Sequence, residues 1–317
     1  EKAIIKLQKT IHNQNINIIL EVNNMELWQL QQLQSLPLEA KIIKTKMRIR
    51  EWYDYWDTNI CVSFSGGKDS TVLLHIVREL YPDVPAVFVD TGLEYPEIRN
   101  FVKTIDNVEW LKPKMNFKEV IKKYGWNYPS KDVANMIYYA KRGSMWALNA
   151  LQGLNPDGSY SDFKQRYKKW QYLIDAPFII SNKCCLIMKE EPLNRFHKEK
   201  KLNPIIATMA SESQRRKNSY LKTGCNAFDS KIPISKPLSF WTEQDILTYI
   251  KTYEIPYASI YGDIIQNSKG QLETTGEKRT GCMFCPVGCH LEKEPNKFQR
   301  MKITHPKIYE YCMKPIE

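Results

Sequence analysis

The sequence predicts an α/β protein with an open, mainly parallel sheet and flanking helices, an N-terminal helical arm and a cysteine-rich C-terminal region. Short β-rich runs alternate with amphipathic stretches between residues 60 and 113, so each strand would lead through a helical crossover to a parallel neighbour. The first two runs end in turns that contain glycine and polar residues. Open α/β sheets bind ligands at this carboxyl edge.

The elements of this sheet follow one another in a regular order. Residues 26–56 repeat apolar side chains at three-to-four spacing, which predicts the helical arm. Runs rich in β-branched and aromatic residues predict strands: ICVSFS at 60–65, PAVFVDTG at 85–92 and NVEWLKP at 107–113. The stretches between them have helical periodicity: DSTVLLHIVRELY at 69–81 and YPEIRNFVKTI at 95–105.

The second half of the chain is less regular. Residues 116–182 are rich in Tyr, Trp, Lys and Asn and show no clear period, with a loop at 153–162. PIIATMASES at 204–213 predicts a further strand and turn. Thr242 with Asp245 is typical of a capping box that opens a helix.

Three domains are expected from this order, and the tail from Gly262 is turn-rich with most of the late cysteines. The first two predicted domains are an extension with the helical arm over 1–58 and a nucleotide-binding domain over 59–240. A helical, cysteine-rich region over 241–317 would fold back and complete a metal site.

The composition is basic, with 46 Lys and Arg against 35 Asp and Glu and a net charge of +11. Basic clusters at Lys164–Lys169, Lys198–Lys201 and Arg215–Lys217 are either solvated surface or a site for an anionic partner such as nucleic acid. No apolar run reaches the ~18 residues that a membrane span needs. We therefore expect a cytoplasmic protein with no membrane partner.

The stretch SGGKDS, which follows the first predicted strand, has the features of a phosphate-binding loop. Gly66 and Gly67 let the backbone approach an anion and turn its N–H groups toward it. Lys68 adds a full charge, Ser65 and Ser70 add hydroxyl donors, and the following helix adds the positive end of its dipole. The spacing differs from the Walker motif Gly-x-x-x-x-Gly-Lys-Ser/Thr.

This loop resembles the Ser-Gly-Gly-x-Asp-Ser pyrophosphate loop of the PP-loop (ATP pyrophosphatase) superfamily, whose members cleave ATP between its α and β phosphates. Residues 63–98 are similar to the phosphoadenosine-phosphosulfate (PAPS) reductase branch of that superfamily. The resemblance implies an adenine nucleotide alpha hydrolase-like fold and Mg²⁺-ATP as cofactor. It also implies catalytic roles for Lys68, Asp69 and Arg216. The implied nucleotide-binding residues are Ser63, Ser65, Gly66, Gly67, Lys68, Asp69, Ser70, Asp90, Thr91, Gly92, Glu212, Ser213 and Arg216.

Eight cysteines are present, and in a cytosolic chain their clustering favours metal binding over disulfides. Cys184 and Cys185 are adjacent, and Cys282 and Cys285 form a Cys-x-x-Cys-Pro turn. Zinc and free redox thiols remain alternatives to iron for these residues. The pattern resembles that of assimilatory adenylyl-sulfate reductases, which implies a [4Fe–4S] cluster on these four thiolates, with Cys289 as a substitute ligand.

Two features separate the chain from those reductases, which usually carry a degraded glycine loop and a C-terminal Glu-Cys-Gly-x-His. Here SGGKDS is intact and the chain ends YEYCMKPIE. An intact loop beside a thiolate cluster resembles the ATP pyrophosphatase of DNA-phosphorothioation systems and the cluster-dependent tRNA thiolases. The resemblance implies ATP cleavage that activates a substrate, and cluster-dependent sulfur transfer with nucleic acid as a candidate acceptor.

The expected partners are an adenine nucleotide and a protein that supplies sulfur or electrons, either a cysteine desulfurase or a thioredoxin-like protein. Two other functions stay open. The first is a PAPS or adenylyl-sulfate reductase that releases sulfite. The second is a catalytically silent, nucleotide- and redox-sensing subunit of a larger assembly.

Overall fold

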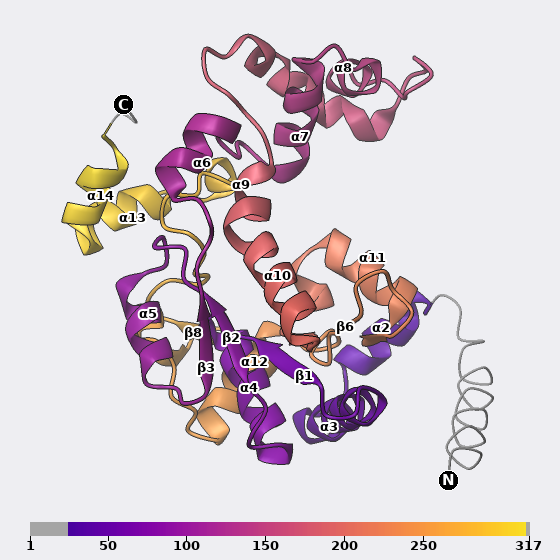
Figure 1. Cartoon of the computed structure of the whole chain (residues 1–317), viewed down its shortest axis with the longest axis vertical. Coiled ribbons are helices and arrows are strands. Elements are labelled where there is room, and N and C mark those ends of the chain that lie inside the picture. Colours follow the sequence, from indigo (N-terminus) through magenta and orange to yellow (C-terminus); the bar gives the residue numbers. More distant parts are fainter. Residues whose placement is uncertain (1–24, 315–317) are drawn as a thin grey trace. The chain divides into compact units, whose positions relative to one another are not determined.

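The computed structural model describes residues 25–314, and the extension predicted at 1–24 lies outside these residues. The chain forms two compact units, each made of several segments (Figure 1). Within the described residues, the first unit comprises Met25–Phe88, Asn100–Glu109 and Lys200–Arg279. The second unit comprises Val89–Arg99, Trp110–Glu199 and Thr280–Lys314. The domain boundaries expected from the sequence stay a prediction.

A six-stranded sheet runs in the order β3-β2-β1-β4-β6-β5. Its strands are β1 (Ile60–Ser63), β2 (Ala86–Val89), β3 (Val108–Leu111), β4 (Asn203–Ile206), β5 (Asn226–Ala227) and β6 (Ile234–Ser235). β1 pairs in parallel with β2 and β4, β4 pairs in parallel with β6, and β6 pairs with β5 in antiparallel orientation. The predicted fold class, a mainly parallel open sheet with flanking helices, is confirmed.

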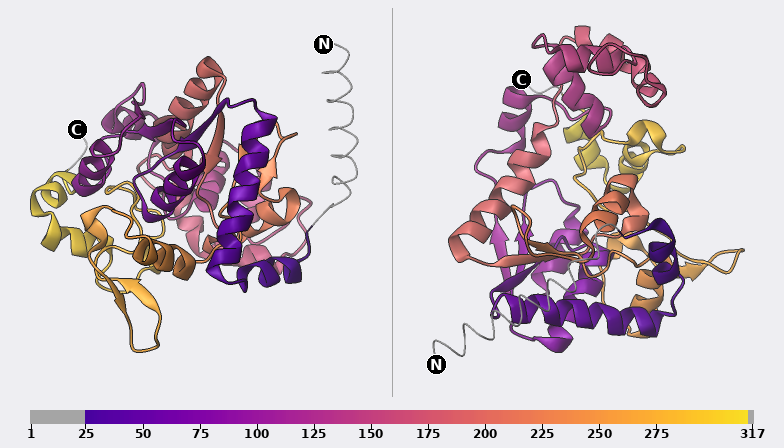
Figure 2. Two further views of the ribbon diagram at one scale, coloured as in Figure 1. Left: turned by 90° about the horizontal axis from the view of Figure 1, so that it is seen from below. Right: turned by 90° about the vertical axis from the view of Figure 1, so that its right-hand side faces the viewer.

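The helices of the first unit come from separate stretches of the chain. They are α2 (Leu27–Gln34), α3 (Leu38–Tyr55), α4 (Lys68–Leu80), α11 (Gln214–Thr223) and α12 (Glu243–Thr252), with the 3₁₀ turns η3 (Ala210–Glu212) and η4 (Ser259–Tyr261). α3 and α12 both pack against α4. An antiparallel hairpin, β7 (Ile264–Gln266) with β8 (Leu272–Thr274), projects from this unit in both views of Figure 2.

The predicted helical arm consists of two helices, α2 and α3. Pro37 is the N-cap of α3 with ψ 151°, since the residues around a proline disfavour the helical conformation. The capping box predicted at α12 is confirmed: the Thr242 hydroxyl accepts from Asp245 N, and the Asp245 carboxylate accepts from Thr242 N at 2.7 Å.

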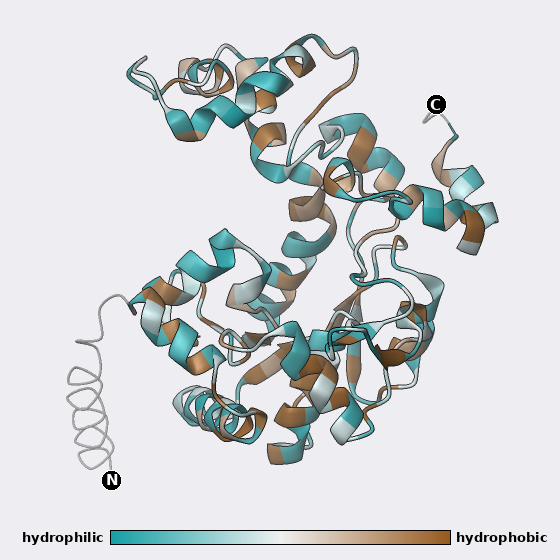
Figure 3. Ribbon diagram, turned by 180° about the vertical axis from the view of Figure 1, so that it is seen from behind, coloured by the Kyte–Doolittle hydropathy of each residue, from teal (hydrophilic) through white to brown (hydrophobic). Residues whose placement is uncertain are grey.

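The core of the first unit lies between β1 and α4. Ile60, Cys61 and Val62 are fully buried, as are Val72 and Ile76 on the inner face of α4. Figure 3 shows the strands of the sheet coloured mainly as hydrophobic. Apolar burial on this scale drives the packing and fixes where β1 ends and α4 begins. The segment between them is the predicted phosphate loop.

The second unit is mainly helical. It contains α6 (Phe117–Tyr124), α7 (Lys131–Ala140), α8 (Met145–Leu151), η1 (Asp162–Asp175), α9 (Lys183–Cys185), η2 (Leu186–Glu190), η5 (Cys289–Leu291), α13 (Lys297–Thr304) and α14 (Pro306–Cys312). α5 (Pro96–Lys103) and α10 (Glu191–Lys200) are divided between the two units. The predicted turn-rich tail is thus partly helical, in α13 and α14.

One continuous helical stretch of the second unit contains a π-helix in its middle. α9, η2 and α10 follow one another without a break from Lys183 to Lys200, and Leu186–Glu190 is a π-helix. Cys184 and Cys185 lie in the turn directly before it. π-helical insertions are rare and often occur at functional sites because they redirect the side chains around them.

No helix among residues 25–314 is both long enough and apolar enough to cross a membrane.

Candidate nucleotide site and cysteine pocket

The phosphate loop is held by hydrogen bonds among its own residues. The Ser70 hydroxyl donates to the Gly67 carbonyl at 2.9 Å and accepts from Ser65 N at 3.2 Å. The Ser65 and Ser70 hydroxyls are 3.0 Å apart, and Gly67 N donates to the Ser65 hydroxyl at 3.3 Å. Gly66 has φ +71°, a left-handed conformation that favours glycine. Ser63 ends β1 just before this loop.

α4 begins directly at this loop. Gly67 is its N-cap, and Lys68, Asp69 and Ser70 are its first three residues. The first N–H groups of a helix have no carbonyl partner within that helix, and together with the helix dipole they favour an anion. The loop and the start of α4 therefore have the features of an anion-binding site, and the binding role of these residues stays a prediction.

Lys68 supplies the charge of this arrangement from a buried position. Its side chain is 5% exposed, with Nζ 3.4 Å from Glu243 Oε1 and 5.0 Å from the ring centroid of Tyr261. A buried ammonium needs such partners because its removal from water is costly. Glu243 is 60% exposed, so an anionic ligand could take over its role as partner of Lys68.

Two arginines lie near the loop. Arg216 forms an ion pair with Glu212, and Arg279 Nη2 lies 3.9 Å from Glu212 Oε1. Burial raises the pKa of Asp69, whereas the nearby charges of Lys68, Arg279 and Arg216 lower it. Burial and the charge of Arg279 lower the pKa of Arg216. The two guanidinium groups and the Asp69 carboxylate therefore lie within electrostatic reach of one another.

The predicted Glu-Ser-x-x-Arg segment is built from η3 and α11. Glu212 accepts from Met209 N at 2.9 Å, and Ser213 is the N-cap of α11, accepting from Arg216 N at 3.3 Å. These caps fix where α11 begins and hence where Arg216 lies. The structure brings Glu212, Ser213 and Arg216 into the same unit as the SGGKDS loop.

Sequence reasoning missed Glu243, Tyr261 and Arg279 at this site. Arg279 precedes the Thr-Gly-Cys turn of the first cysteine motif, and Glu243 follows the capping residue Thr242. Neither position has a recognisable spacing from SGGKDS. Only the fold brings residues near 70, 212, 243 and 279 together.

Asp90, Thr91 and Gly92 belong to the second unit. The Asp90 carboxylate accepts from Arg99 Nη2 at 2.7 Å and from Gly92 N at 3.1 Å. Thr91 donates to the Glu94 carboxylate through its backbone N–H at 2.9 Å and its hydroxyl at 2.8 Å. These contacts order the turn, and the nucleotide-binding role of its residues stays a prediction.

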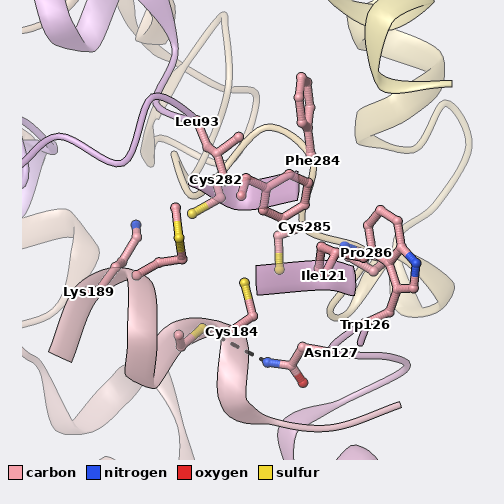
Figure 4. Close-up of a pocket in the computed structure, with 13 residues that line it drawn as sticks. Leu93, Ile121, Trp126, Asn127, Cys184, Lys189, Cys282, Phe284, Cys285 and Pro286 are labelled. Atoms are coloured by element: carbon pink, nitrogen blue, oxygen red, sulfur yellow. Dashed lines mark hydrogen bonds between the residues drawn. The ribbon is translucent and has the colours of Figure 1, made fainter. Parts of the chain in front are cut away.

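Cys184, Cys185, Cys282 and Cys285 all line one pocket in the second unit. Figure 4 shows the sulfur atoms of Cys184, Cys282 and Cys285 directed into the same space. The fold therefore brings together two pairs that are about a hundred residues apart in sequence. Most of the other walls are apolar: Leu93, Phe117, Ile121, Trp126, Met188, Phe284 and Pro286.

Two polar side chains of this pocket donate toward sulfur. Asn127 Nδ2 lies 3.9 Å from Cys185 Sγ, and Lys189 hydrogen-bonds the Cys282 thiol while its Nζ lies 3.5 Å from Glu94. Burial and the neighbouring thiols raise the pKa of Cys184 to about 12. A cation would favour the thiolate form of such closely placed thiols.

The donor set of the pocket suits a thiolate-bound cluster, since all four predicted ligands line it and N–H groups face its sulfurs. No three His, Cys, Asp or Glu side chains within the described range form a group that could hold a metal ion as they stand. Cys289 begins η5, and the pocket wall formed by residues 93–286 does not include it. The ligand assignment stays a proposal.

Residues 59–139 and 147–292 match the model of the phosphoadenosine phosphosulfate reductase domain, which is well over half of the chain. The chain belongs to this family. The family resemblance predicted from the SGGKDS segment is confirmed, and with it the assignment to the PP-loop superfamily.

Relatives of this family member are distant. Two uncharacterised proteins of Methanocaldococcus jannaschii are 23% and 25% identical over 277 residues, which covers 83% and 86% of this chain but 42% and 51% of those proteins. The chain thus spans about half the length of these curated relatives. A phosphoadenosine 5'-phosphosulfate reductase of Xylella fastidiosa is 22% identical over 234 residues, 73% of this chain and 79% of that protein.

Among solved structures, the family member is similar to a phosphoadenylyl-sulfate reductase from Candida auris, crystallised as a phosphate complex. The two are 16% identical with a TM-score of 0.39, over 78% of this chain and 98% of that chain.

Proposed function

We propose that the protein binds Mg²⁺-ATP at the SGGKDS loop, cleaves it to AMP and pyrophosphate, and so activates an acceptor for sulfur transfer at the cysteine pocket. The observation that carries the proposal is the intact loop, in which Ser65, Gly67 and Ser70 are interlocked at the start of α4. Lys68 lies in the loop, and Arg216 and Arg279 supply further positive charge nearby. This is the charge distribution that a triphosphate needs.

The proposed first step is adenylation. An oxygen of the acceptor attacks the α-phosphorus, the bond from that phosphorus to the bridging oxygen breaks, and pyrophosphate leaves with the electron pair. Lys68 and the two arginines stabilise the charge that develops on pyrophosphate, which is a larger effect in the transition state than in the ground state. The Asp69 carboxylate is the residue of the loop that would hold Mg²⁺.

The proposed second step replaces AMP by sulfur. A [4Fe–4S] cluster held by Cys184, Cys185, Cys282 and Cys285 would supply the activated sulfur, delivered by a cysteine desulfurase-type donor. The protein's own residues shape the pocket: apolar side chains such as Phe117 and Trp126 exclude water, and Asn127 orients the Cys185 thiolate. The acceptor oxygen leaves with AMP, and atoms and electrons balance when a thiol reductant supplies the two electrons that convert the donor's persulfide sulfur to sulfide.

A second candidate is reduction of PAPS or adenylyl sulfate to sulfite with electrons from a thioredoxin-like protein. It is favoured by the names of curated relatives, which include PAPS reductases of Xylella fastidiosa and adenosine 5'-phosphosulfate reductases of staphylococci. A phosphate-binding loop with Arg216 beside it would accept a sulfate ester as well.

Calorimetric titration of anaerobically purified protein separates the two candidates. We expect tight binding of Mg²⁺-ATP, weak binding of PAPS and adenylyl sulfate, and pyrophosphate release once an acceptor is supplied. The variant Arg216→Ala should weaken Mg²⁺-ATP binding about tenfold, the loss of one charge-assisted contact. Its matched control is the exposed neighbour, Arg215→Ala, which should bind as the wild type does. Sulfite release from either ester, with the opposite order of affinities, would establish the reductase.

A further inference from the structure

The region between residues 131 and 175 is a small helical module with its own core. α7, α8 and η1 pack on one another, and Ile137, Ala147 and Leu151 are fully buried between them. Figure 1 shows the three elements together. This module makes no contribution to the phosphate loop or to the pocket wall, so the proposed function leaves it unexplained.

The outer face of α7 and α8 carries a row of aromatic side chains with a cation on it. Tyr139 lies 5.3 Å from Tyr138 and 5.6 Å from Trp146 between ring centroids, and the Arg142 guanidinium stacks 3.6 Å over Tyr138. Tyr139 is 37% and Trp146 41% exposed. Aromatic rings of this size are normally buried, so an exposed row of them indicates a binding surface.

η1 repeats the same combination. The Arg166 guanidinium lies 3.8 Å over Phe163 and 4.7 Å from Tyr167, and Lys169 Nζ lies 5.2 Å over Trp170. Phe163 is 63% exposed. The heptapeptide FKQRYKK at 163–169, directly before Trp170, has four cations and no acid. Exposed rings interleaved with lysine and arginine match a polyanion whose units carry flat aromatic groups.

Both rows contact residues next to the cysteines. Lys183, which precedes Cys184, places its Nζ 5.9 Å over the Tyr138 ring. The Trp170 ring packs edge-on against His290, 5.1 Å away, and His290 follows Cys289. A ligand lying along the module would therefore end beside the segments that form the cysteine pocket.

We propose that this module binds single-stranded nucleic acid, with its bases stacked on the exposed rings and its phosphates paired with the lysines and arginines. Unpaired bases expose the faces that stack on such rings, whereas a duplex hides them. The role of this strand as the sulfur acceptor rests on the proposed function, but its binding does not. RNA and DNA share the recognised chemistry, and the experiment distinguishes them.

The test measures binding of fluorescent 20-nucleotide strands to the full chain: single-stranded RNA, single-stranded DNA and their duplexes. We expect single strands to bind at least tenfold more weakly to the triple variant Lys164→Gln/Lys168→Gln/Lys169→Gln. The slope of the logarithm of the binding constant against the logarithm of the salt concentration should become shallower by about 2, because ~0.7 ions are released per phosphate contact. The matched control, Lys198→Gln/Lys200→Gln/Lys201→Gln, removes the same charge from the end of α10 and should bind as the wild type does.

A second pair of variants tests stacking. Trp146→Ala should weaken binding about fivefold or more with an unchanged salt slope, because base stacking is not an ionic contact. Trp28→Ala removes a ring that is even more exposed, 60% against 41%, from α2 in the first unit and should have no effect. Circular dichroism of each variant establishes that it is folded.

The proposal is overturned if both lysine triples weaken binding equally, if Trp146→Ala and Trp28→Ala behave alike, or if duplexes bind better than single strands. Preference between the RNA and DNA strands identifies the kind of nucleic acid. Failure of the proposed function is a separate result: Mg²⁺-ATP titration of the same proteins would then show no binding, while strand binding to the module persists.

Discussion

The phosphate loop and the cysteine pocket are assembled in opposite ways. The loop consists of consecutive residues whose hydrogen bonds connect positions two to five apart, as between Ser65 and Ser70. The pocket depends on Cys184 and Cys282, which only the completed second unit brings together. A site made from local contacts tolerates changes elsewhere in the chain. A site made from distant segments depends on the folding of its whole unit.

Among the variants that test the difference between the two sites, Lys68→Ala is expected to cause the largest loss of activity. It removes the buried charge of the loop, and adenylation should fall roughly 10²–10³-fold, as when one transition-state donor is lost. The readout is pyrophosphate release. Lys46→Ala, which removes an exposed charge paired with Glu79 on the same α4, is the control and should retain activity. Equal losses in the two variants would contradict a specific role for Lys68.

The pocket is tested by Cys184→Ser. We expect most of the iron bound after anaerobic reconstitution to be lost, with Mg²⁺-ATP affinity unchanged within about twofold, because distant sites usually act independently. Iron content and the visible absorption spectrum are the measurements. Cys312→Ser changes a half-exposed thiol of the same unit and should keep its iron. Iron retained by Cys184→Ser would remove that residue from the ligand set.

The variant Asp69→Asn tests whether the carboxylate that would hold Mg²⁺ also lowers the stability of the folded protein. Burial raises the pKa of Asp69, so the folded protein binds this proton more tightly than the unfolded chain does. Stability therefore falls as pH rises through the folded pKa, and the ionised carboxylate is unfavourable at neutral pH. We expect Asp69→Asn to raise the free energy of unfolding at pH 7. The gain should shrink below the pKa of an ordinary aspartate.

The same Asp69→Asn variant should bind Mg²⁺-ATP more weakly, because an amide replaces the carboxylate that would hold the cation. Denaturant titrations at pH 4 and pH 7, with and without Mg²⁺-ATP, measure both effects. A destabilised variant without ligand would show that the carboxylate is a structural residue.

The smallest expected effects come from the helix caps of the two units. Thr242→Ala removes the cap of α12 in the first unit, and Ser130→Ala removes the cap of α7 in the second, where the hydroxyl accepts from Val133 N at 3.2 Å. Each should lower the free energy of unfolding by about 1 kcal/mol. If the units unfold separately, each variant shifts one step of thermal unfolding. Equal shifts of one transition would show that the units unfold together.

Much of the first unit could be predicted because its signals are local. The strand, glycine turn and helix around Gly66 follow from residues adjacent in sequence, as does the cap at Thr242. Pro37 marks in the sequence where the two helices of the arm meet. A proline at such a position ends one helix and starts another, whatever the period around it.

The remaining site residues could not be predicted, since nothing local identifies them. Arg279 approaches Glu212, and Tyr261 lies by Lys68, only after the chain has folded. The sequence of the module at 131–175 shows no clear helical period of apolar residues, because η1 is a 3₁₀ stretch whose side chains do not follow the 3.6-residue repeat. The core residues of this module, among them Tyr167, are partly small and partly aromatic, and their spacing in the sequence shows little regularity.

The interleaving of the two units has a consequence for how such a protein could arise. The chain passes from one unit to the other after Phe88, Arg99, Glu109, Glu199 and Arg279. A single crossover between genes therefore cannot exchange one unit while keeping the other whole. New chemistry in either unit has to come from insertions inside existing connections or from point substitutions. Exchange of one whole unit would need a crossover at each of these five connections.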